Sequence, residues 1–178
     1  MADALSATTL WQRVSQNFIS DDGSLPTVEL QHLMPQEVGG LYELIRAGAR
    51  VVSEDATFWD LSSERDRALD DVVNAGALVP AGQAAPFHFA VEGVREAGVS
   101  VPCLGVHVFQ DSIAIDYRMG VDWRREQVWA FFLWLRRLLS GTQAGVLKLG
   151  EEAPPEGESF MAAWKWFQEN QPSDRGSP

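Results

Sequence analysis

Two histidines and an aspartate are the residues of this sequence whose types and spacing can support chemistry. His88, His107 and Asp116 each occupy a polar position in a segment where apolar and polar residues alternate. Two imidazoles and a carboxylate can bind a transition-metal ion, or can act as a base with an acid that orients it. Either chemistry requires the three side chains on one face of one sheet, so the surrounding elements decide whether they meet.

Three consecutive segments, 86–95, 101–109 and 113–119, show the two-residue alternation of β-strands. Short turns separate them, so we predict an antiparallel meander with one apolar face and one mixed face. The predicted apolar face is formed by Phe87, Phe89, Val91, Leu104, Val106, Val108, Ile113, Ile115 and Tyr117. The polar positions that alternate with them form the mixed face.

The length of the first turn decides whether the two histidines meet. A two-residue loop at Ala97-Gly98 places His88 opposite His107, with their Cβ atoms about 5 Å apart. A three-residue loop over 96–98 instead reverses the faces of the first strand and removes His88 from the mixed face. The sequence alone leaves both loops open.

The second turn decides how the aspartate joins the histidines. A loop of Asp111-Ser112 places His107 directly opposite Asp116, whereas a loop of Gln110-Asp111 makes them diagonal neighbours. We expect Gly105 to leave open space beside them. The alternative to a site is a set of cross-strand polar pairs that only stabilises the sheet, which is the more common arrangement.

A long helix is predicted directly after the meander, with Asp122 as its N-cap and Gly141 just past its end. Its apolar stripe is Val128, Phe131, Phe132, Leu135, Leu138 and Leu139. Trp129, Leu133 and Trp134 fall outside this stripe, so the helix is apolar almost all round. Either a second layer of the same domain covers these three residues or a partner does, and we favour the second layer.

The remaining elements are predicted from shorter patterns: a helix from Thr8 or Thr9 to Ile19, a strand over 26–33, a helix from Pro35 to about Gly48, an edge strand over 145–149 and a final helix over 158–168. The range 51–76 is either one long helix or a short extended piece followed by a helix that begins at Ser62 or Ser63. We prefer the second alternative, because adjacent serines favour a helix cap over a helix interior.

Together these elements predict an α+β fold, an antiparallel sheet of about four strands with helices packed mainly on one face. We predict a single domain over residues 1–170 and a disordered polar tail over 171–178.

The composition excludes several classes of protein. A net charge of −11 and a pI near 4.6 argue against binding to nucleic acid, which requires clustered basic residues. A single cysteine excludes a disulfide framework and a cysteine-based zinc site. The longest apolar run, 128–135, is too short to cross a membrane, and the N-terminus lacks the pattern of a signal peptide. We therefore expect a cytoplasmic protein, and the excess of arginine over lysine suggests a GC-rich bacterial genome.

The acidity, the seven tryptophans and the lack of a known catalytic motif favour a protein-binding function without a cofactor. Our first interpretation is an immunity or inhibitor protein that masks a basic effector, or a protein that binds a second copy of itself. The predicted contact residues are Trp123, Trp129, Trp134, Glu92 and Asp116. The alternative is a metal-assisted or acid–base enzyme that acts on a small molecule through His88, His107 and Asp116.

Overall fold

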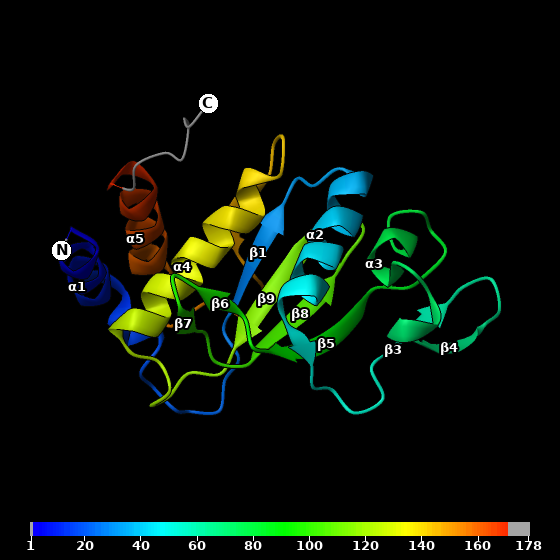
Figure 1. Ribbon diagram of the computed structural model, residues 1–178, viewed down its shortest axis with the longest axis horizontal. Helices are drawn as coiled ribbons and strands as arrows, with labels where there is room; N and C mark the ends of the chain where they lie inside the picture. The colour runs from blue at the N-terminus through cyan, green and yellow to red at the C-terminus, as the bar shows by residue number, and fades with distance from the viewer. Residues whose placement is uncertain (1, 171–178) are drawn as a thin grey trace.

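A six-stranded antiparallel sheet forms the centre of the fold, in the order β10-β1-β9-β8-β5-β2 (Figure 1). The computed structural model describes residues 2–170, and the predicted tail over 171–178 lies outside them. The strands of this sheet are β1 (Thr27–Gln31), β2 (Arg50–Val51), β5 (Phe87–Glu92), β8 (Leu104–Val108), β9 (Ile113–Tyr117) and β10 (Val146–Leu149). The predicted α+β fold is confirmed. The strand that the sequence analysis missed, β2, has two residues and is too short to show alternation.

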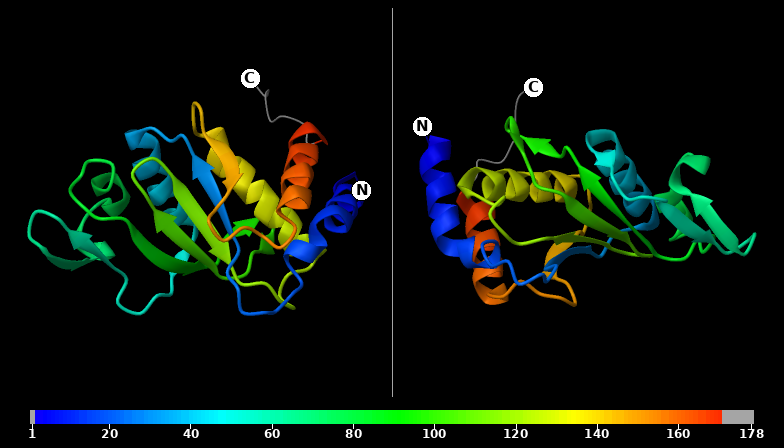
Figure 2. Two further views of the ribbon diagram at one scale, coloured as in Figure 1. Left: turned by 180° about the vertical axis from the view of Figure 1, so that it is seen from behind. Right: turned by 90° about the horizontal axis from the view of Figure 1, so that it is seen from below.

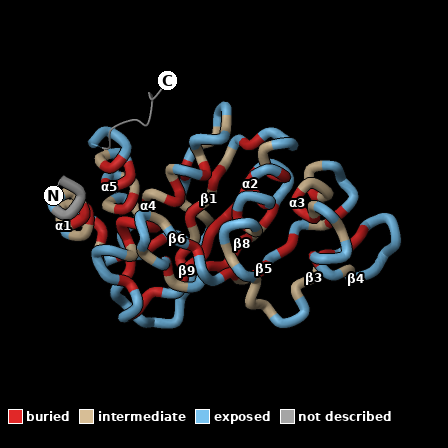
Figure 3. The backbone as a smooth tube through the Cα atoms, viewed as in Figure 1, coloured by how far each residue is buried: buried red, intermediate tan, exposed pale blue. Residues whose placement is uncertain are grey.

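Two helices, α2 (Pro35–Gly48) and α4 (Arg125–Ser140), lie on the same side of the sheet (Figure 2, right). The side chains that the strands direct toward these helices are fully buried, among them Val28, Phe89, Val106 and Ile115. The opposite side of the sheet, called the open face below, is turned to the viewer in Figure 2 (left), with α2 and α4 behind it. In Figure 3 the buried backbone accordingly follows the central strands and the inner sides of the helices.

A second layer of helices packs against α4. It consists of α1 (Ala2–Val14) and α5 (Gly157–Asn170), which contact both α4 and each other. The ring of Phe167 lies 5.2 Å from that of Trp129, and Trp134 is stacked on Phe131 at 6.3 Å. Trp129 is thus covered by a second layer of the same domain, the alternative that we favoured, and Trp134 is also buried within the described residues. None of the helices over residues 2–170 combines the length and hydropathy that a membrane span requires.

The helix α4 begins at Arg125 with Arg124 as its N-cap, two residues later than predicted, and Asp122 is exposed and does not cap it. The reason is the side chain of Trp123, which is buried against Phe18 and donates its indole N–H to the carbonyl of Arg118 at 2.7 Å. This anchor holds the chain in a turn before the helix can start. The first helix also differs from the prediction, because it begins at Ala2 and is followed by a short 3₁₀ turn, η1 (Ser15–Asn17).

The helix predicted from Ser62 or Ser63 to Ala75 is wrong. This region forms a hairpin of β3 (Thr57–Asp60) and β4 (Arg65–Ala68), then a 3₁₀ turn, η2 (Leu69–Asp71), and a short helix, α3 (Ala75–Leu78). The carboxylate of Asp60 accepts hydrogen bonds from the backbone N–H groups of Ser62 and Ser63, so these serines form a turn. Arg67 donates to the same carboxylate at 2.8 Å across the hairpin. The predicted extended piece at 57–61 corresponds to β3.

The turn between β6 (Arg95–Glu96) and β7 (Val99–Ser100) is the two-residue loop Ala97-Gly98. Both loop residues have positive φ angles, 49° and 80°, as a type I′ hairpin turn requires. Glycine adopts this conformation without steric cost. The two-residue alternative for the first turn is therefore confirmed, and it fixes the faces of the strands on either side.

Candidate functional site

The strand register brings His88, His107 and Asp116 together on the open face. His88 pairs directly with His107 across β5 and β8. Between β8 and β9, His107 pairs with Ala114 and Gly105 pairs with Asp116. This register corresponds to the Gln110-Asp111 loop, so Asp116 is a diagonal neighbour of His107 rather than its direct partner.

One carboxylate oxygen holds the three side chains together. Oδ2 of Asp116 lies 2.8 Å from Nε2 of His107 and 3.2 Å from Nε2 of His88. The two imidazole rings are 4.1 Å apart between centroids. One ligand atom from each residue can be chosen so that all three lie within 4.8 Å of one another. We call this group the His–Asp–His cluster.

Gly105 makes the position of the carboxylate possible, in a way that differs from the prediction. A Cβ atom at position 105 would overlap the carboxylate of Asp116. The space above this glycine is thus filled by the aspartate side chain and is not open. Because the carboxylate lies across β8 at this point, it can reach both histidines from the neighbouring strand.

The aspartate is buried, whereas the histidines are accessible. The Asp116 side chain is 10 % exposed, and those of His88 and His107 are 46 % and 37 % exposed. Burial by itself raises the pKa of the Asp116 carboxyl, but hydrogen bonds from His107 and His88 and their charges outweigh it and hold the pKa at about 2. The cluster therefore presents an ionised carboxylate beneath two imidazoles that a ligand can reach.

A cavity of about 450 Å³ adjoins the cluster on the open face. This volume is in the range of small-molecule sites. Strands β1, β8 and β9, the residues next to β1 and β8, and the segment after β10 supply its lining: Leu25, Thr27, Glu29, His107, Phe109, Ala114, Asp116, Gly150, Glu151 and Glu152. Apart from His107 and Asp116, these lining residues were not predicted, although Glu29 occupies a polar position in the alternation of β1.

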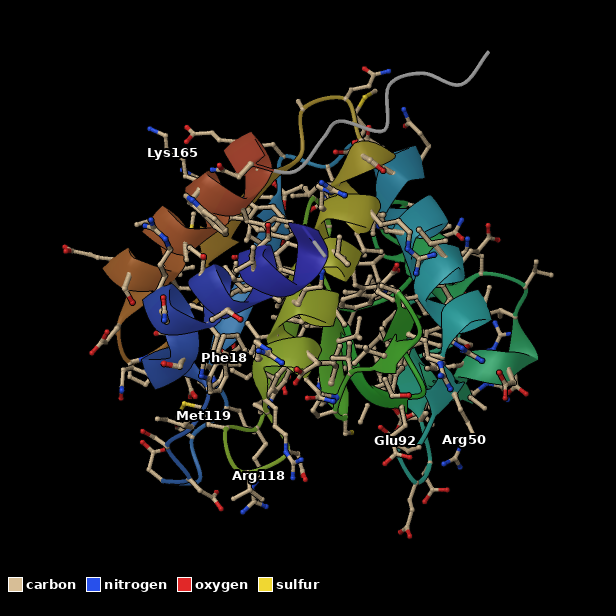
Figure 4. All side chains as sticks on the ribbon, turned by 60° about the vertical axis from the view of Figure 1, so that its left-hand side comes forward. Phe18, Arg50, Glu92, Arg118, Met119 and Lys165 are labelled. Atoms are coloured by element: carbon tan, nitrogen blue, oxygen red, sulfur yellow. The ribbon has the colours of Figure 1, made fainter. Side chains whose placement is uncertain are left out.

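Glu92 does not belong to the cluster. It lies at the end of β5, where its carboxylate accepts a hydrogen bond from Arg50 of β2 at 3.0 Å. Figure 4 shows these two side chains together at one edge of the molecule. A second cavity, of about 440 Å³, is lined by both residues, but their charged groups are already paired there. Both residues were predicted to contact a partner, but Glu92 is exposed in an ion pair with Arg50 and Asp116 is buried.

The three tryptophans predicted as contact residues lie in the core. Trp123, Trp129 and Trp134 are 2 %, 7 % and 2 % exposed. Trp129 and Trp134 are covered within the chain itself, and Trp123 packs against Phe18 and Tyr117. Their burial removes the exposed aromatic surface on which the predicted partner contact depended.

Comparisons with known proteins provide no assignment for this site. No protein-family model matches the chain, and neither does any curated protein or solved structure. The geometry of the His–Asp–His cluster and of the adjoining cavity is therefore the basis on which a function can be inferred.

Proposed function

We propose that the protein acts on a small molecule at the open face of its sheet, with the His–Asp–His cluster as the reactive group. One observation carries this proposal: a buried carboxylate oxygen holds two accessible imidazoles beside a cavity of small-molecule size. Clusters of this composition serve as metal ligands or as catalytic bases with their orienting acids. The sequence analysis gave this function as its alternative.

The contacts of the cluster favour this role over simple sheet stabilisation. Exposed cross-strand pairs contribute at most about 1 kcal/mol, and they do not require a buried charge. Burying a carboxylate is costly unless hydrogen bonds compensate for it, and at Asp116 both compensating groups are histidines. By contrast, Asp60 receives its hydrogen bonds from an arginine, a serine hydroxyl and backbone N–H groups, as a structural carboxylate does.

The proposal can be tested by incubating the purified protein with a polar metabolite extract and following the extract by mass spectrometry. We expect the wild-type protein to consume at least one metabolite, and His107→Asn to lower that rate at least about 100-fold. The matched control is His32→Asn, because His32 is exposed on a turn with φ 62°, a conformation that asparagine tolerates. Equal consumption by His107→Asn and wild type would contradict the proposal.

A second candidate is the masking of a basic protein partner, as an immunity or inhibitor protein does. The observation that favours it is the net charge of −11 together with the exposed Glu151 and Glu152 at the rim of the open face. A cytoplasmic location stays a prediction for either function.

This candidate also has a direct test. A basic polypeptide that co-purifies with the protein should be released when Glu151 and Glu152 are both changed to lysine. It should be retained when the exposed Glu158 and Glu169 of α5 are changed in the same way. Retention by both double variants would exclude a masking surface at the rim of the open face.

A further inference from the structure

We propose that the His–Asp–His cluster binds a first-row divalent transition-metal ion through Nε2 of His88, Nε2 of His107 and the carboxylate of Asp116. This inference rests on the proposed function, since it takes the open face as the active surface, and it names the cofactor that would make the cluster reactive. Over residues 2–170, this is the one group of three or more potential metal-ligating side chains that lie close enough together to share an ion.

The imidazoles of His88 and His107 converge on a single carboxylate oxygen. Both rings direct the same nitrogen, Nε2, toward one oxygen of Asp116, at 2.8 and 3.2 Å. A general base needs only one histidine and one orienting carboxylate. A metal ion uses all three groups, because each replaces one water of its hydration shell.

Paired strands carry the three ligands and hold them in place. The three residues come from adjacent strands in the middle of a six-stranded sheet, and their register is set by the paired backbones. The opposite sides of these strands are anchored in the core by Phe89, Val106 and Ile115, each fully buried. Ligands fixed in this way lose little conformational freedom when they bind an ion.

The chemistry of the three ligands determines which ion they select. Two imidazoles and one carboxylate suit zinc, iron, cobalt or nickel, whereas magnesium and calcium prefer sites made entirely of oxygen ligands. Three protein ligands leave further coordination positions for water or substrate, as catalytic sites require. The exposed sides of the imidazoles and the adjoining cavity give a small molecule access to those positions. A bound ion would supply Lewis acidity to an oxygen atom of that molecule.

Coordination changes the protons of the rings in a defined way. A neutral histidine that now donates Nε2–H to Asp116 must carry its proton on Nδ1 once Nε2 binds an ion. Both rings now contact Asp116 through Nε2. The expected signature of binding is therefore a shift of both rings to the Nδ1–H tautomer.

The test is calorimetric titration of the untagged full chain with zinc, repeated with magnesium. We expect one zinc ion per chain and no binding of magnesium. His88→Asn, His107→Asn and Asp116→Asn should each weaken zinc binding at least about 100-fold. Two matched controls, His32→Asn and Asp60→Asn, change the same residue types elsewhere and should keep the wild-type affinity.

Nitrogen NMR of the wild-type imidazoles provides a readout that does not depend on the folding of a variant. Zinc should move His88 and His107 to the Nδ1–H tautomer and leave His32 unchanged. Absence of zinc binding, or binding that survives His107→Asn, would overturn the inference. If metabolite consumption depends on His107 in a protein that binds no zinc, the metal site is refuted and the proposed function stands. If zinc binds through all three residues but the protein consumes no metabolite, the metal site stands and the proposed function is refuted.

Discussion

The two faces of the sheet differ in what their side chains contact. On the face beneath α2 and α4, the residues are apolar and fully buried, and aromatic rings from strands and helices pack edge to face, as Tyr117 and Phe131 do at 5.7 Å. On the open face, polar residues alternate along the same strands, and the His–Asp–His cluster lies among them. Consecutive residues of one strand thus have different roles, since one side chain stabilises the core and the next is accessible to a ligand.

The largest effect on stability is expected from the face beneath α2 and α4. Phe131 is fully buried among Phe18, Tyr117 and Trp123. We expect Phe131→Ala to lower the free energy of unfolding by about 3–5 kcal/mol, because it removes apolar burial and leaves a cavity. Urea denaturation measures this loss.

The milder variant Phe131→Leu keeps most of the side-chain volume and should cost less, so the protein stays folded for a zinc titration. Its zinc affinity should equal that of the wild type. A loss of zinc binding as large as that in His107→Asn would show that the two faces are coupled.

The next largest effect is expected at Gly105, where the open face depends on the absence of a side chain. The methyl group of Gly105→Ala would overlap the Asp116 carboxylate, so we expect a loss of about 1–3 kcal/mol from overpacking and a loss of zinc binding. Gly40→Ala is the matched control, because nothing lies within 4 Å of its added methyl group in α2. That control should stabilise the helix by roughly 0.5–1 kcal/mol. Equal unfolding free energies for the two variants would contradict this account.

Asp60 sharpens the comparison, because it is a buried carboxylate in a hairpin that has no cluster. The hydrogen bond from Arg67, then those from Ser62 and Ser63, hold the pKa of Asp60 well below its usual value of 3.8. A carboxyl with a lowered folded-state pKa stabilises the fold above the unfolded pKa, and that contribution is lost as the pH falls. We expect the thermal midpoint of the wild type to decrease below pH 3.8 more steeply than that of Asp60→Asn. Parallel curves would show that Asp60 adds no acid-sensitive stability.

The smallest effects on stability are expected from the two histidines themselves. Both are partly exposed, and after either substitution the other histidine still donates to Asp116, so His88→Asn and His107→Asn should each lower the unfolding free energy at pH 7 by only about 1 kcal/mol. The change should be larger for His107, whose nitrogen is closer to Asp116. Urea denaturation of both variants checks this order, and a loss of several kcal/mol would assign the cluster to stability instead.

The meander could be predicted from the sequence because its alternation and its short turns are local signals. These signals predicted which positions of β5, β8 and β9 alternate. They also limited His107 and Asp116 to two possible arrangements. The sequence did not decide between the loops Gln110-Asp111 and Asp111-Ser112, because that choice depends on which turn the chain adopts at residues 109–112. The pairing of Phe109 N–H with the Ser112 carbonyl selects the loop of Gln110-Asp111.

Features that depend on distant parts of the chain could not be predicted. The cavity forms because β10 pairs with β1, and because the backbone N–H of Thr27 donates to the carbonyl of Glu152 at 2.6 Å. The serines at 62 and 63 carry the same local signal in a helix cap and in a turn. The turn follows β3, whose Trp59 and Leu61 form backbone hydrogen bonds with Ala85 and Gln83, more than 20 residues away. Trp129 of α4 is buried against Phe167 of α5, near the other end of the described chain, and no pattern within α4 indicates this.

The packing of α5 on α4 has a consequence for the synthesis of the protein. Phe132 of α4 packs against Phe160, Trp164 and Phe167 of α5, and Trp129 packs against Phe167. A ribosome produces the sheet and α4 before it produces α5. The aromatic side chains of α4 that pack against α5 therefore stay uncovered on that side until residue 167 has left the exit tunnel. During that interval the nascent chain presents an aromatic surface of the kind that chaperones bind and that promotes aggregation. The open face, by contrast, can be complete as soon as β10 has joined β1.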